Sequence, residues 1–478
     1  MNLIDTHSHI HRLEFDADRD QVLERARAAG VVAMIDPATD FASCARVVAL
    51  AKQTPDLFAA VGLHPQDAAE FNSQRLEEIR ALAQEPQVVA IGEIGLDTYR
   101  NSCPIQTQKE TFSALARLAM DLDKPMIIHS RETAQAGEGD GAIYRTLFDL
   151  LKTVRKPPFK GVLHCFSGSV DAAMEAIDLG LYISYAGNIT FKKADAFRRI
   201  VQEIPFDRVV IETDAPFLAP QAFRGKRNEP AFVRELVPTL QELLQLGAED
   251  VARVTTVNAH HLFGVGPAPE RGKIAYPIGN SLYINLTNAC TDRCVFCALS
   301  VDDFWKGDGG APFVKGHHLR MQKDPTVEEI LASAGDPGSY DEVVFCGYGE
   351  PVIRLKELTV VSRKLREKGA RRIRLNTNGH GNLIHKRSIA PELKDIVDEV
   401  SVSLNTPNAQ QYLELCRPSF GLETYESIKT FIRECRDQGI KVVATVVTMP
   451  EVDVEACRRI ALDELKVEFR PRTYNDLG

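Results

Sequence analysis

Short runs of apolar residues alternate along the chain with longer amphipathic stretches. Stretches such as 21–29 and 110–122 have helical periodicity, and each short run is typical of a buried strand. In the first part of the chain the runs occupy 3–4, 31–35, 57–62, 88–92, 125–128, 161–163, 181–184 and 209–211. About eight β/α units within some 265 residues have the size and rhythm of a TIM-type (β/α)8 barrel. We therefore expect an α/β fold that begins with such a barrel.

The periodic pattern stops at 264–280, where proline and glycine are frequent. Such a segment is typical of a linker, so we expect one domain over 1–264, a linker over 265–280 and a second domain over 281–478. Beyond the linker, apolar runs resume at 282–286, 342–345, 372–375, 399–403, 441–446 and 466–469. Six strands with helices between them predict a smaller, partial (β/α)6 barrel.

The composition excludes several classes of protein. Of the 478 residues, 44% are hydrophobic and 26% are charged, as in ordinary globular proteins. No stretch approaches the roughly 18 apolar residues of a membrane helix, and the N-terminus lacks the pattern of a signal peptide. Ten cysteines at this length are too sparse for a disulfide framework. We expect a cytoplasmic protein with no membrane partner.

The charge is acidic and unevenly distributed. Residues 266–478 hold 29 basic and 30 acidic side chains, so residues 1–265 carry −8 of the net charge of −9. Proteins that bind nucleic acid without sequence preference are usually strongly basic, because they neutralise phosphates. A nucleic-acid substrate would therefore have to be held by local charges or by metal ions.

Residues of the metal-ligand type end five of the predicted strands in the first domain. His7 and His9 are two positions apart just past the first strand, which directs both side chains to one side, so their imidazoles can bind one metal ion. The others are Glu93, His129, His164 and Asp214. Because catalytic residues of TIM-type barrels gather at the carboxyl ends of the strands, we expect these six side chains to form a metal site.

The first 264 residues resemble the TatD family of metal-dependent deoxyribonucleases and related hydrolases, within the amidohydrolase-like TIM barrels. The motifs that carry the resemblance lie at 5–9, 61–65, 92–97, 128–131, 164–168, 212–216 and 224–230. The resemblance implies that His7, His9, Glu93 and Asp214 hold one divalent metal ion. It also implies that Glu93 bridges to a second ion, held by His129 and His164. Zn, Mn or Mg would suit these ligands.

The chemistry implied by this resemblance is hydrolysis of a phosphoester, with DNA or a nucleotide as substrate. Paired metal ions bind a phosphate oxygen, activate a water and stabilise the leaving oxygen. Asp214 and Glu93 are the expected catalytic residues, and Asp214 would also orient or deprotonate the water. Contacts to the substrate phosphate are expected from His64, Arg224 and Arg227. The family often has a second histidine two residues after His64; Gln66 stands there, which leaves the substrate preference open.

Three cysteines lie within eight residues directly after the first strand of the second domain. Cys290, Cys294 and Cys297 form a C-x3-C-x2-C motif, and three thiolates leave one iron of a 4Fe–4S cluster without a protein ligand. The alternative is a zinc site made of the three thiolates and His317 or His318. Buried apolar roles are expected for the cysteines that lack ligand spacing, Cys416, Cys435 and Cys457.

This spacing, with an aromatic residue before the last cysteine, resembles the radical S-adenosylmethionine (SAM) superfamily over roughly 280–474. The resemblance implies that the open iron chelates the methionine moiety of SAM. Segment 346–351 resembles the glycine-rich motif that supports the methionine amino group, although the usual Gly-Gly is here Tyr348-Gly349. The cofactor-binding residues implied are Gly347, Gly349, Glu350, Pro351, Asn378, Ser403 and Asn405.

The reaction implied for the second domain is one-electron reduction of the sulfonium of SAM by a donor such as flavodoxin or ferredoxin. The resulting 5′-deoxyadenosyl radical abstracts a hydrogen atom, and the protein supplies orientation and exclusion of water. Pocket shape rather than the cluster motif sets the target, so the substrate is not predicted. An insertion at 302–309 and 315–320, which holds the single Trp305, is equally consistent with a pocket wall and with a surface loop.

We therefore expect a bifunctional enzyme, a TatD-like two-metal phosphoester hydrolase fused to a radical SAM enzyme. Two alternatives remain open. In the first, the N-terminal domain hydrolyses a small nucleotide-derived phosphoester or an amide linked to a radical SAM modification pathway. Its excess of acidic residues favours this alternative. Alternatively, one domain would be a non-catalytic regulator, which the complete ligand sets in both domains argue against.

Overall fold

The computed structural model describes residues 1–100, 102–132, 141–297 and 313–473. The chain divides into two compact units, Met1–Ala268 and Pro269–Gly478. The part of the insertion that holds Trp305 lies outside the described residues. Within the described ranges, no helix combines the length and the apolar character that crossing a membrane requires.

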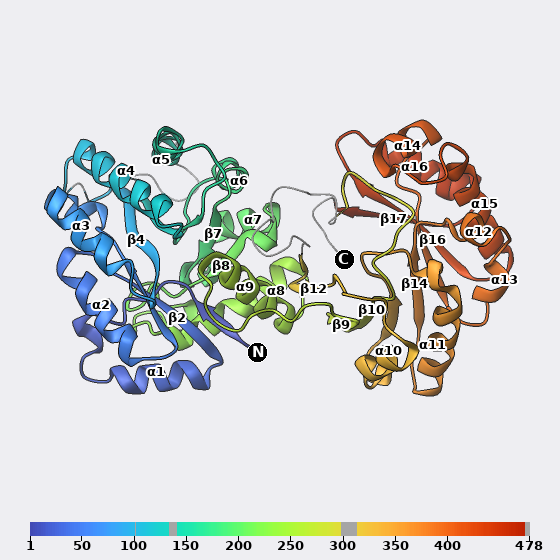
Figure 1. The fold of residues 1–478 in the computed structure, drawn as a ribbon, viewed down its shortest axis with the longest axis horizontal. Coiled ribbons are helices and arrows are strands. Elements are labelled where there is room, and N and C mark those ends of the chain that lie inside the picture. Colours follow the sequence, from blue (N-terminus) through green and yellow to red (C-terminus); the bar gives the residue numbers. More distant parts are fainter. Residues whose placement is uncertain (101, 133–140, 298–312, 474–478) are drawn as a thin grey trace. The chain divides into compact units, whose positions relative to one another are not determined.

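The first unit is built on eight parallel strands that follow one another in sequence order (Figure 1). They are β1 Leu3–Asp5, β2 Val31–Pro37, β3 Leu57–Val61, β4 Val88–Asp97, β5 Met126–Arg131, β6 Gly161–Leu163, β7 Tyr182–Tyr185 and β8 Val209–Ile211. The ends of β1 and β8 join because the N–H of Thr6 donates to Ile211 O (3.1 Å) and the N–H of Asp214 donates to His7 O (2.8 Å). The expected TIM-type barrel is confirmed.

Helices cover the outside of this barrel (Figure 1). They are α1 Arg19–Ala28, α2 Phe41–Gln53, α3 Ser73–Leu82, α4 Ile105–Asp121, α5 Ala142–Val154, α6 Val170–Asp178, α7 Asp195–Glu203, α8 Leu236–Leu244 and α9 Ala248–Phe263. Their starts follow local sequence signals, as in α2, where Asp40 caps the first turn by accepting from the N–H of Ser43 (2.7 Å).

Along each strand, side chains point alternately to the inside and to the outside of the barrel. Inward-facing apolar side chains fill the middle of the barrel, since successive residues of a strand point to opposite faces. This inner layer consists of Ile4, Ala33, Ile35, Ala60, Ala90, Ile127, Val162, Tyr182 and Val210. Leu262 and Phe263 of α9 pack against it, so apolar contacts occupy this region and the polar residues follow at the carboxyl ends of the strands.

The second unit contains a seven-stranded sheet in the order β17-β16-β15-β14-β13-β10-β9. The strands are β9 Ala275–Ile278, β10 Ser281–Ile284, β13 Glu342–Phe345, β14 Ile373–Thr377, β15 Glu399–Ser403, β16 Lys441–Thr448 and β17 Glu468–Thr473. The six expected strands are parallel to one another, whereas β9 is antiparallel to β10. The partial parallel barrel of the second domain is confirmed.

Strand β9 lies in the segment that we expected to be a linker. It is an edge strand, and Pro277 sits opposite Leu282 of β10. An edge strand tolerates proline because the missing N–H faces away from the sheet. Pairing with β10 through two residues, Gly279 and Asn280, therefore orders a stretch whose composition indicates irregular structure.

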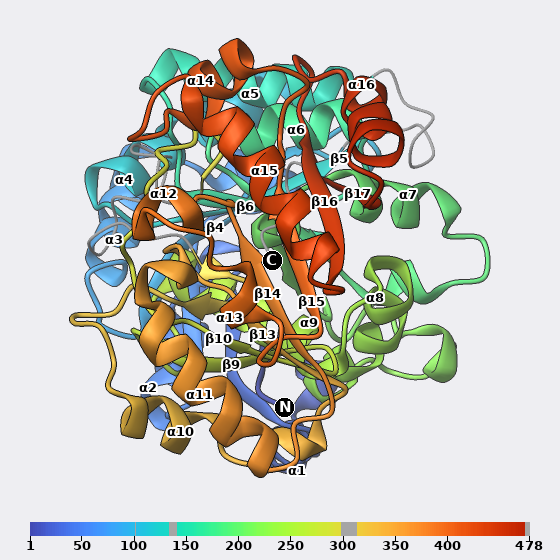
Figure 2. The ribbon, with the colours of Figure 1, turned by 90° about the vertical axis from the view of Figure 1, so that its right-hand side faces the viewer.

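Helices pack on the sheet of the second unit (Figure 2). They are α10 Val327–Ala334, α11 Leu355–Glu367, α12 Gly381–His385, α13 Ala390–Leu393, α14 Ala409–Cys416, α15 Glu423–Asp437 and α16 Val454–Arg459. A two-stranded ribbon, β11 Phe313–Val314 with β12 His317–His318, forms a separate small sheet. Cys416, Cys435 and Cys457 are fully buried in this core, as expected.

Candidate functional site

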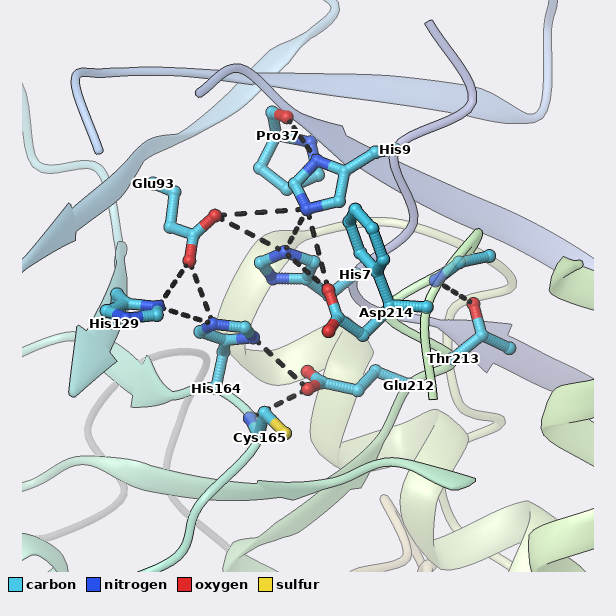
Figure 3. Close-up of polar contacts among 12 residues, drawn as sticks. His7, His9, Pro37, Glu93, His129, His164, Cys165, Glu212, Thr213 and Asp214 are labelled. Carbon is cyan, nitrogen blue, oxygen red and sulfur yellow. Dashed lines mark hydrogen bonds and ion pairs between the residues drawn. The ribbon is translucent and has the colours of Figure 1, made fainter. Parts of the chain in front are cut away.

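Two pairs of histidines lie on either side of the Glu93 carboxylate (Figure 3). Oε2 of Glu93 lies 3.7 Å from Nε2 of His7 and 3.9 Å from Nε2 of His9. Oε1 lies 2.8 Å from Nδ1 of His129 and 2.9 Å from Nε2 of His164. Each carboxylate oxygen thus faces its own pair of imidazoles.

Spacing within each pair suits a shared metal ion. Nε2 of His7 and Nε2 of His9 are 3.2 Å apart, and Nδ1 of His129 and Nε2 of His164 are also 3.2 Å apart. Two imidazole nitrogens bound to one Zn²⁺ ion lie about 3.0–3.4 Å apart, given metal–nitrogen bonds of about 2.0–2.1 Å. The donor set therefore fits two divalent ions on the two sides of Glu93.

Asp214 completes the side of His7 and His9. Its Oδ1 lies 3.7 Å from Nε2 of His7 and 3.5 Å from Nε2 of His9, and these three residues form one compact group of ligand atoms. The backbone hydrogen bond from Asp214 to His7, described above, fixes the end of β8 against the end of β1. The structure therefore brings together all six ligand residues expected from the sequence.

A close approach of β4 to β5 places Glu93 beside His129. Gly95 has φ +150°, and a Cβ atom on it would lie 1.9 Å from the carbonyl oxygen of His129. No L-residue with a side chain fits there. Glycine at position 95, two residues after Glu93, is therefore required if the Glu93 carboxylate is to lie so close to the His129 ring.

Each of three ligand histidines donates its second ring N–H to an oxygen behind it. The contacts are His9 Nδ1 to Pro37 O (3.0 Å), His129 Nε2 to Asp97 Oδ2 (3.3 Å) and His164 Nδ1 to Glu212 Oε1 (3.3 Å). Such contacts fix the tautomer and leave the other nitrogen free to bind a metal. None of these partners was predicted from the sequence, although Asp97 and Glu212 lie within the motifs at 92–97 and 212–216.

Burial and neighbouring rings set the charges at this site. Burial alone would raise the pKa of Glu93, but nearby histidines, above all His164, hold it well below its ordinary value, so Glu93 is ionised. Burial lowers the pKa of His64 to about 3, and that ring is neutral. Nδ1 of His64 accepts from the N–H of Gln66 (3.1 Å), so the ring proton is on Nε2, which lies 3.8 Å from Oε1 of Glu93.

A cavity of about 620 Å³ opens over this site. His9, Glu93, His129, His164 and Asp214 line its floor, with His64 beside them, and its cationic lining residues are Arg12, Arg100 and Arg131. The expected substrate residues Arg224 and Arg227 do not line it. The guanidinium of Arg227 is bonded to both carboxylate oxygens of Asp18 (2.8 and 2.7 Å), and that of Arg224 stacks on Phe191 at 4.6 Å. These contacts hold both side chains elsewhere.

A second site lies in the C-terminal unit. Cys290, Cys294 and Cys297 line a cavity of about 220 Å³. Six of the seven expected cofactor-binding residues line the same cavity, namely Gly347, Gly349, Glu350, Asn378, Ser403 and Asn405. Pro351 is the exception and begins the short 3₁₀ helix Pro351–Arg354. Residues from the ends of β10, β13, β14 and β15 thus converge on the three cysteines.

The glycine-rich segment packs directly against the chain that leads to Cys290. A Cβ atom on Gly349 would lie 2.3 Å from Thr287 O and 2.5 Å from Ala289 O. The N–H of Glu350 donates to Ala289 O (2.8 Å). Glycine at 349 is therefore required for the end of β13 to meet the cysteine loop.

Glu350 and Asn378 tie the loops around the cysteines together. The buried Glu350 carboxylate accepts from Thr377 Oγ1 (2.8 Å) and from the N–H of Asn378 (2.7 Å), and burial raises its pKa to about 7. The amide of Asn378 donates to Thr291 Oγ1 (2.9 Å) and to Asp292 Oδ2 (3.2 Å). Asn378 also lines the cysteine cavity, so its predicted contact with a cofactor stays a prediction beside this structural role.

The geometry argues against the alternative zinc site. Among the described residues, no three cysteines bring their sulfur atoms within 4.8 Å of one another, whereas sulfur ligands of one zinc ion lie closer than about 4.6 Å. His317 donates from Nε2 to Pro277 O (2.9 Å), and Nδ1 of His318 accepts from the N–H of Gly272 (3.3 Å). Neither histidine lines the cysteine cavity. Three separated thiolates suit a multi-iron cluster.

Both units match known families. Residues 4–264 match the family of TatD related DNases, and residues 284–462 match the radical SAM superfamily. The chain belongs to the TatD related DNase family and combines its metal-dependent hydrolase domain with a radical SAM domain.

Proteins of known sequence or structure that are similar to this chain align with its first unit. Residues of this unit are 36% identical to the uncharacterized metal-dependent hydrolase YabD of Bacillus subtilis, over 55% of this chain and 99% of YabD. They are 34% identical to the 3'-5' ssDNA/RNA exonuclease TatD of Erwinia tasmaniensis, over 53% of this chain and 96% of that protein. The crystal structure of the TatD homologue YjjV of Escherichia coli covers 55% of this chain and 98% of YjjV, with 33% identity and a TM-score of 0.50.

Proposed function

We infer that this chain is a bifunctional enzyme. Its N-terminal unit hydrolyses phosphoester bonds of nucleic acid with two divalent ions (Zn, Mn or Mg), and its C-terminal unit uses a 4Fe–4S cluster and SAM on a substrate that the sequence does not identify. The observation that carries the first activity is the position of Glu93 between two histidine pairs, each with a nitrogen–nitrogen distance of 3.2 Å. A carboxylate shared by two such pairs is the arrangement that a two-metal site needs.

The residues have separable roles. His7, His9 and Asp214 hold one ion, His129 and His164 hold the other, and Glu93 binds both. The bound ions supply Lewis acidity and a water of lowered pKa. Asp214 orients that water and accepts its proton, while Nε2–H of His64 donates to a phosphate oxygen from the cavity wall.

Exposed aromatic rings at the cavity favour single-stranded nucleic acid. Phe217 lines the cavity with 45% of its surface exposed, and the guanidinium of Arg12 lies 5.2 Å from its ring. Tyr99 does not itself line the cavity, but its 54% exposed ring lies 4.1 Å from the guanidinium of Arg131, which does. Aromatic faces next to arginines bind unpaired bases by stacking. The relative from Erwinia tasmaniensis, named as a single-strand exonuclease, supports the same substrate class.

The C-terminal unit holds its cofactors at the cysteine cavity. Cys290, Cys294 and Cys297 bind the cluster, and Gly347, Gly349, Ser403 and Asn405 contact SAM. Glu350, Pro351 and Asn378 support the loops around it. A bound cluster with SAM supplies one-electron chemistry on reduction by a donor such as flavodoxin or ferredoxin, and the unit orients the substrate and excludes water.

Metal analysis of anaerobically prepared protein tests both sites together. We expect about four irons with labile sulfide and two further divalent ions per chain. His129→Ala should lose one of those two ions and His9→Ala should lose the other, while His260→Ala, outside the site, keeps both. Zinc without labile sulfide would contradict the radical SAM half.

Activity is measured on 5′-labelled single-stranded DNA, RNA, a mononucleotide panel and amide substrates. Stepwise shortening of the DNA that disappears in Glu93→Gln confirms the hydrolase proposal. Turnover of mononucleotide esters or amides without DNA cleavage would favour the small-substrate alternative. Metal binding without turnover of any of these substrates would indicate a regulatory unit.

A further inference from the structure

The C-terminal unit contains another cavity, of about 280 Å³, beside the cysteine cavity. Strands β10, β14, β15, β16 and β17 supply its lining. The two cavities share five lining residues, Tyr283, Asn376, Ser403, Arg472 and Thr473. The two cavities are therefore adjacent.

Three arginines line this cavity, and none of its lining residues is acidic. The guanidinium of Arg374 is paired with Glu342 at 2.8 Å. Arg470 lies 3.5 Å from Glu399, a carboxylate that also pairs with Lys441 at 3.4 Å and with Arg372. Lys441 also pairs with Glu468 at 3.0 Å, and Arg372 also lies 3.9 Å from Glu342. Among the described residues, three carboxylates (Glu342, Glu399 and Glu468) thus face four cations, and Arg470 shares its carboxylate with two of the other cations.

Among the residues that the structure describes, no carboxylate pairs with Arg472, the third of these arginines. Its Nε atom is buried and has no hydrogen-bond partner within the part of the chain that the structure describes. A buried N–H without an acceptor is costly, and a charged one more so. Because Arg472 lines both cavities, an acceptor bound in either can reach it. The Nε–H of Arg472 can therefore donate to an oxygen of a molecule bound in either cavity.

We propose that this arginine-lined cavity binds an anionic group, phosphate or carboxylate, of the molecule on which the C-terminal unit acts. Arginine pairs with both groups through parallel charge-assisted hydrogen bonds, and Tyr283, Asn376 and Ser403 add neutral hydrogen-bonding groups. The proposal rests on the proposed function, in which SAM occupies the adjoining cavity, because a substrate that loses a hydrogen atom must lie next to the group that removes it.

The test uses the full chain, prepared anaerobically, with pyrophosphate, orthophosphate and malonate as probes. Binding is measured by calorimetry for the parent, Arg472→Met and Arg472→Lys. Arg371→Met is the matched control, because Arg371 is 67% exposed and outside the cavity. All four proteins keep the same N-terminal metal site, so differences between them report the C-terminal cavity. Modification of arginines by phenylglyoxal, mapped by mass spectrometry, gives a second measure.

We expect Arg472→Met to weaken binding of at least one probe about tenfold, with Arg472→Lys intermediate and Arg371→Met within about twofold of the parent. The same probe should protect Arg472 from phenylglyoxal. Preference for pyrophosphate or for malonate identifies the anion. Equal binding by Arg472→Met and the parent, or modification of Arg472 unaffected by every probe, would overturn the proposal. Iron content and SAM binding are measured in parallel, so a failure of the proposed function is seen separately in the parent chain.

Discussion

Oδ2 of Asp97 lies 3.3 Å from Nε2 of His129, on the edge of the imidazole ring away from the nitrogen that faces Glu93. The same Asp97 oxygen accepts from Nε2 of Gln66 (3.1 Å). Gln66 occupies the position where the TatD family often has a histidine. A carboxylate behind a ligand histidine fixes its tautomer and raises its basicity, so Asp97 positions His129 without touching a metal ion.

Asp97→Asn tests that positioning role. The amide cannot stabilise a positively polarised ring as the carboxylate does, so we expect metal affinity at one of the two positions to fall about 10–100-fold. Competition with a fluorescent chelator measures the affinity. Asp67→Asn is the control, because Asp67 lines the same cavity and its only contact with a histidine among the described residues is a backbone one, to His64 O. Equal affinities in parent and Asp97→Asn would exclude the role.

His64 should act as a neutral hydrogen-bond donor. Nδ1 accepts a backbone hydrogen bond, which leaves the proton on Nε2, and a glutamine side chain can place an N–H near the position of Nε2 whereas asparagine cannot. We expect His64→Gln to keep about tenfold more phosphodiesterase activity than His64→Asn. Metal content should be the same in both variants. A higher activity in His64→Asn would indicate that Nδ1, not Nε2, serves the reaction.

Phe217→Ala separates base stacking from phosphate chemistry. Loss of one stacking platform costs about 1–3 kcal/mol per base, so KM for single-stranded DNA should rise while kcat for methyl phosphodiesters, which carry no base, stays unchanged. Leu13→Ala, at an exposed apolar residue that does not line the cavity, is the matched control. An unaltered KM for DNA would remove Phe217 from the substrate path.

Gly95→Ala should destabilise the barrel strongly. The added Cβ atom would overlap the carbonyl of His129, and strain together with displacement of β5 is expected to cost more than about 3 kcal/mol. Gly225→Ala also places a side chain at positive φ, but nothing lies within 4 Å of the new atom, so about 1 kcal/mol is expected. Urea unfolding measures the free energy of unfolding of both variants. Similar losses in Gly95→Ala and Gly225→Ala would contradict the conclusion that close packing at Gly95 matters.

The two activities should be lost under opposite treatments. Chelation by EDTA removes divalent ions from histidine and carboxylate ligands, so hydrolysis should fall to background while 5′-deoxyadenosine formation continues. Exposure to air should bleach the cluster and stop 5′-deoxyadenosine formation, with hydrolysis retained. Both activities are assayed on one preparation. Simultaneous loss under either treatment would show that the sites are coupled or that the assignment of cofactors is wrong.

The fold and the ligand set were predictable because both depend on short-range patterns. Alternating apolar runs specify the strands. A polar residue that directly follows such a run therefore lies at the carboxyl end of the barrel. His7 and Asp214 therefore meet although 206 residues separate them along the chain. In the second unit, the cysteine spacing and the resemblance to the radical SAM superfamily predicted ten residues for the cysteine cavity, and all of these except Pro351 line it.

The remaining features depend on tertiary contacts that leave no local signal. Arg224 and Arg227 are long side chains on a loop, and an ion pair with Asp18 decides where Arg227 points. The hydrogen-bond partner of the His9 ring is the backbone carbonyl of Pro37. Every residue has such a carbonyl, so the residue type at position 37 does not predict this contact. Strand β9 forms because β10 offers a free edge, whereas its own composition indicates a linker.

Because hydrogen bonds join β1 to β8, the hydrolase centre cannot be completed before Asp214 has been synthesised. Its ligands come from both ends of the first unit, so a growing polypeptide that stops before Asp214 lacks a carboxylate and also the strand that closes the ring behind His7. No fragment released early in translation can carry the complete set of ligands. Potential nuclease activity is thereby confined to chains whose barrel has closed.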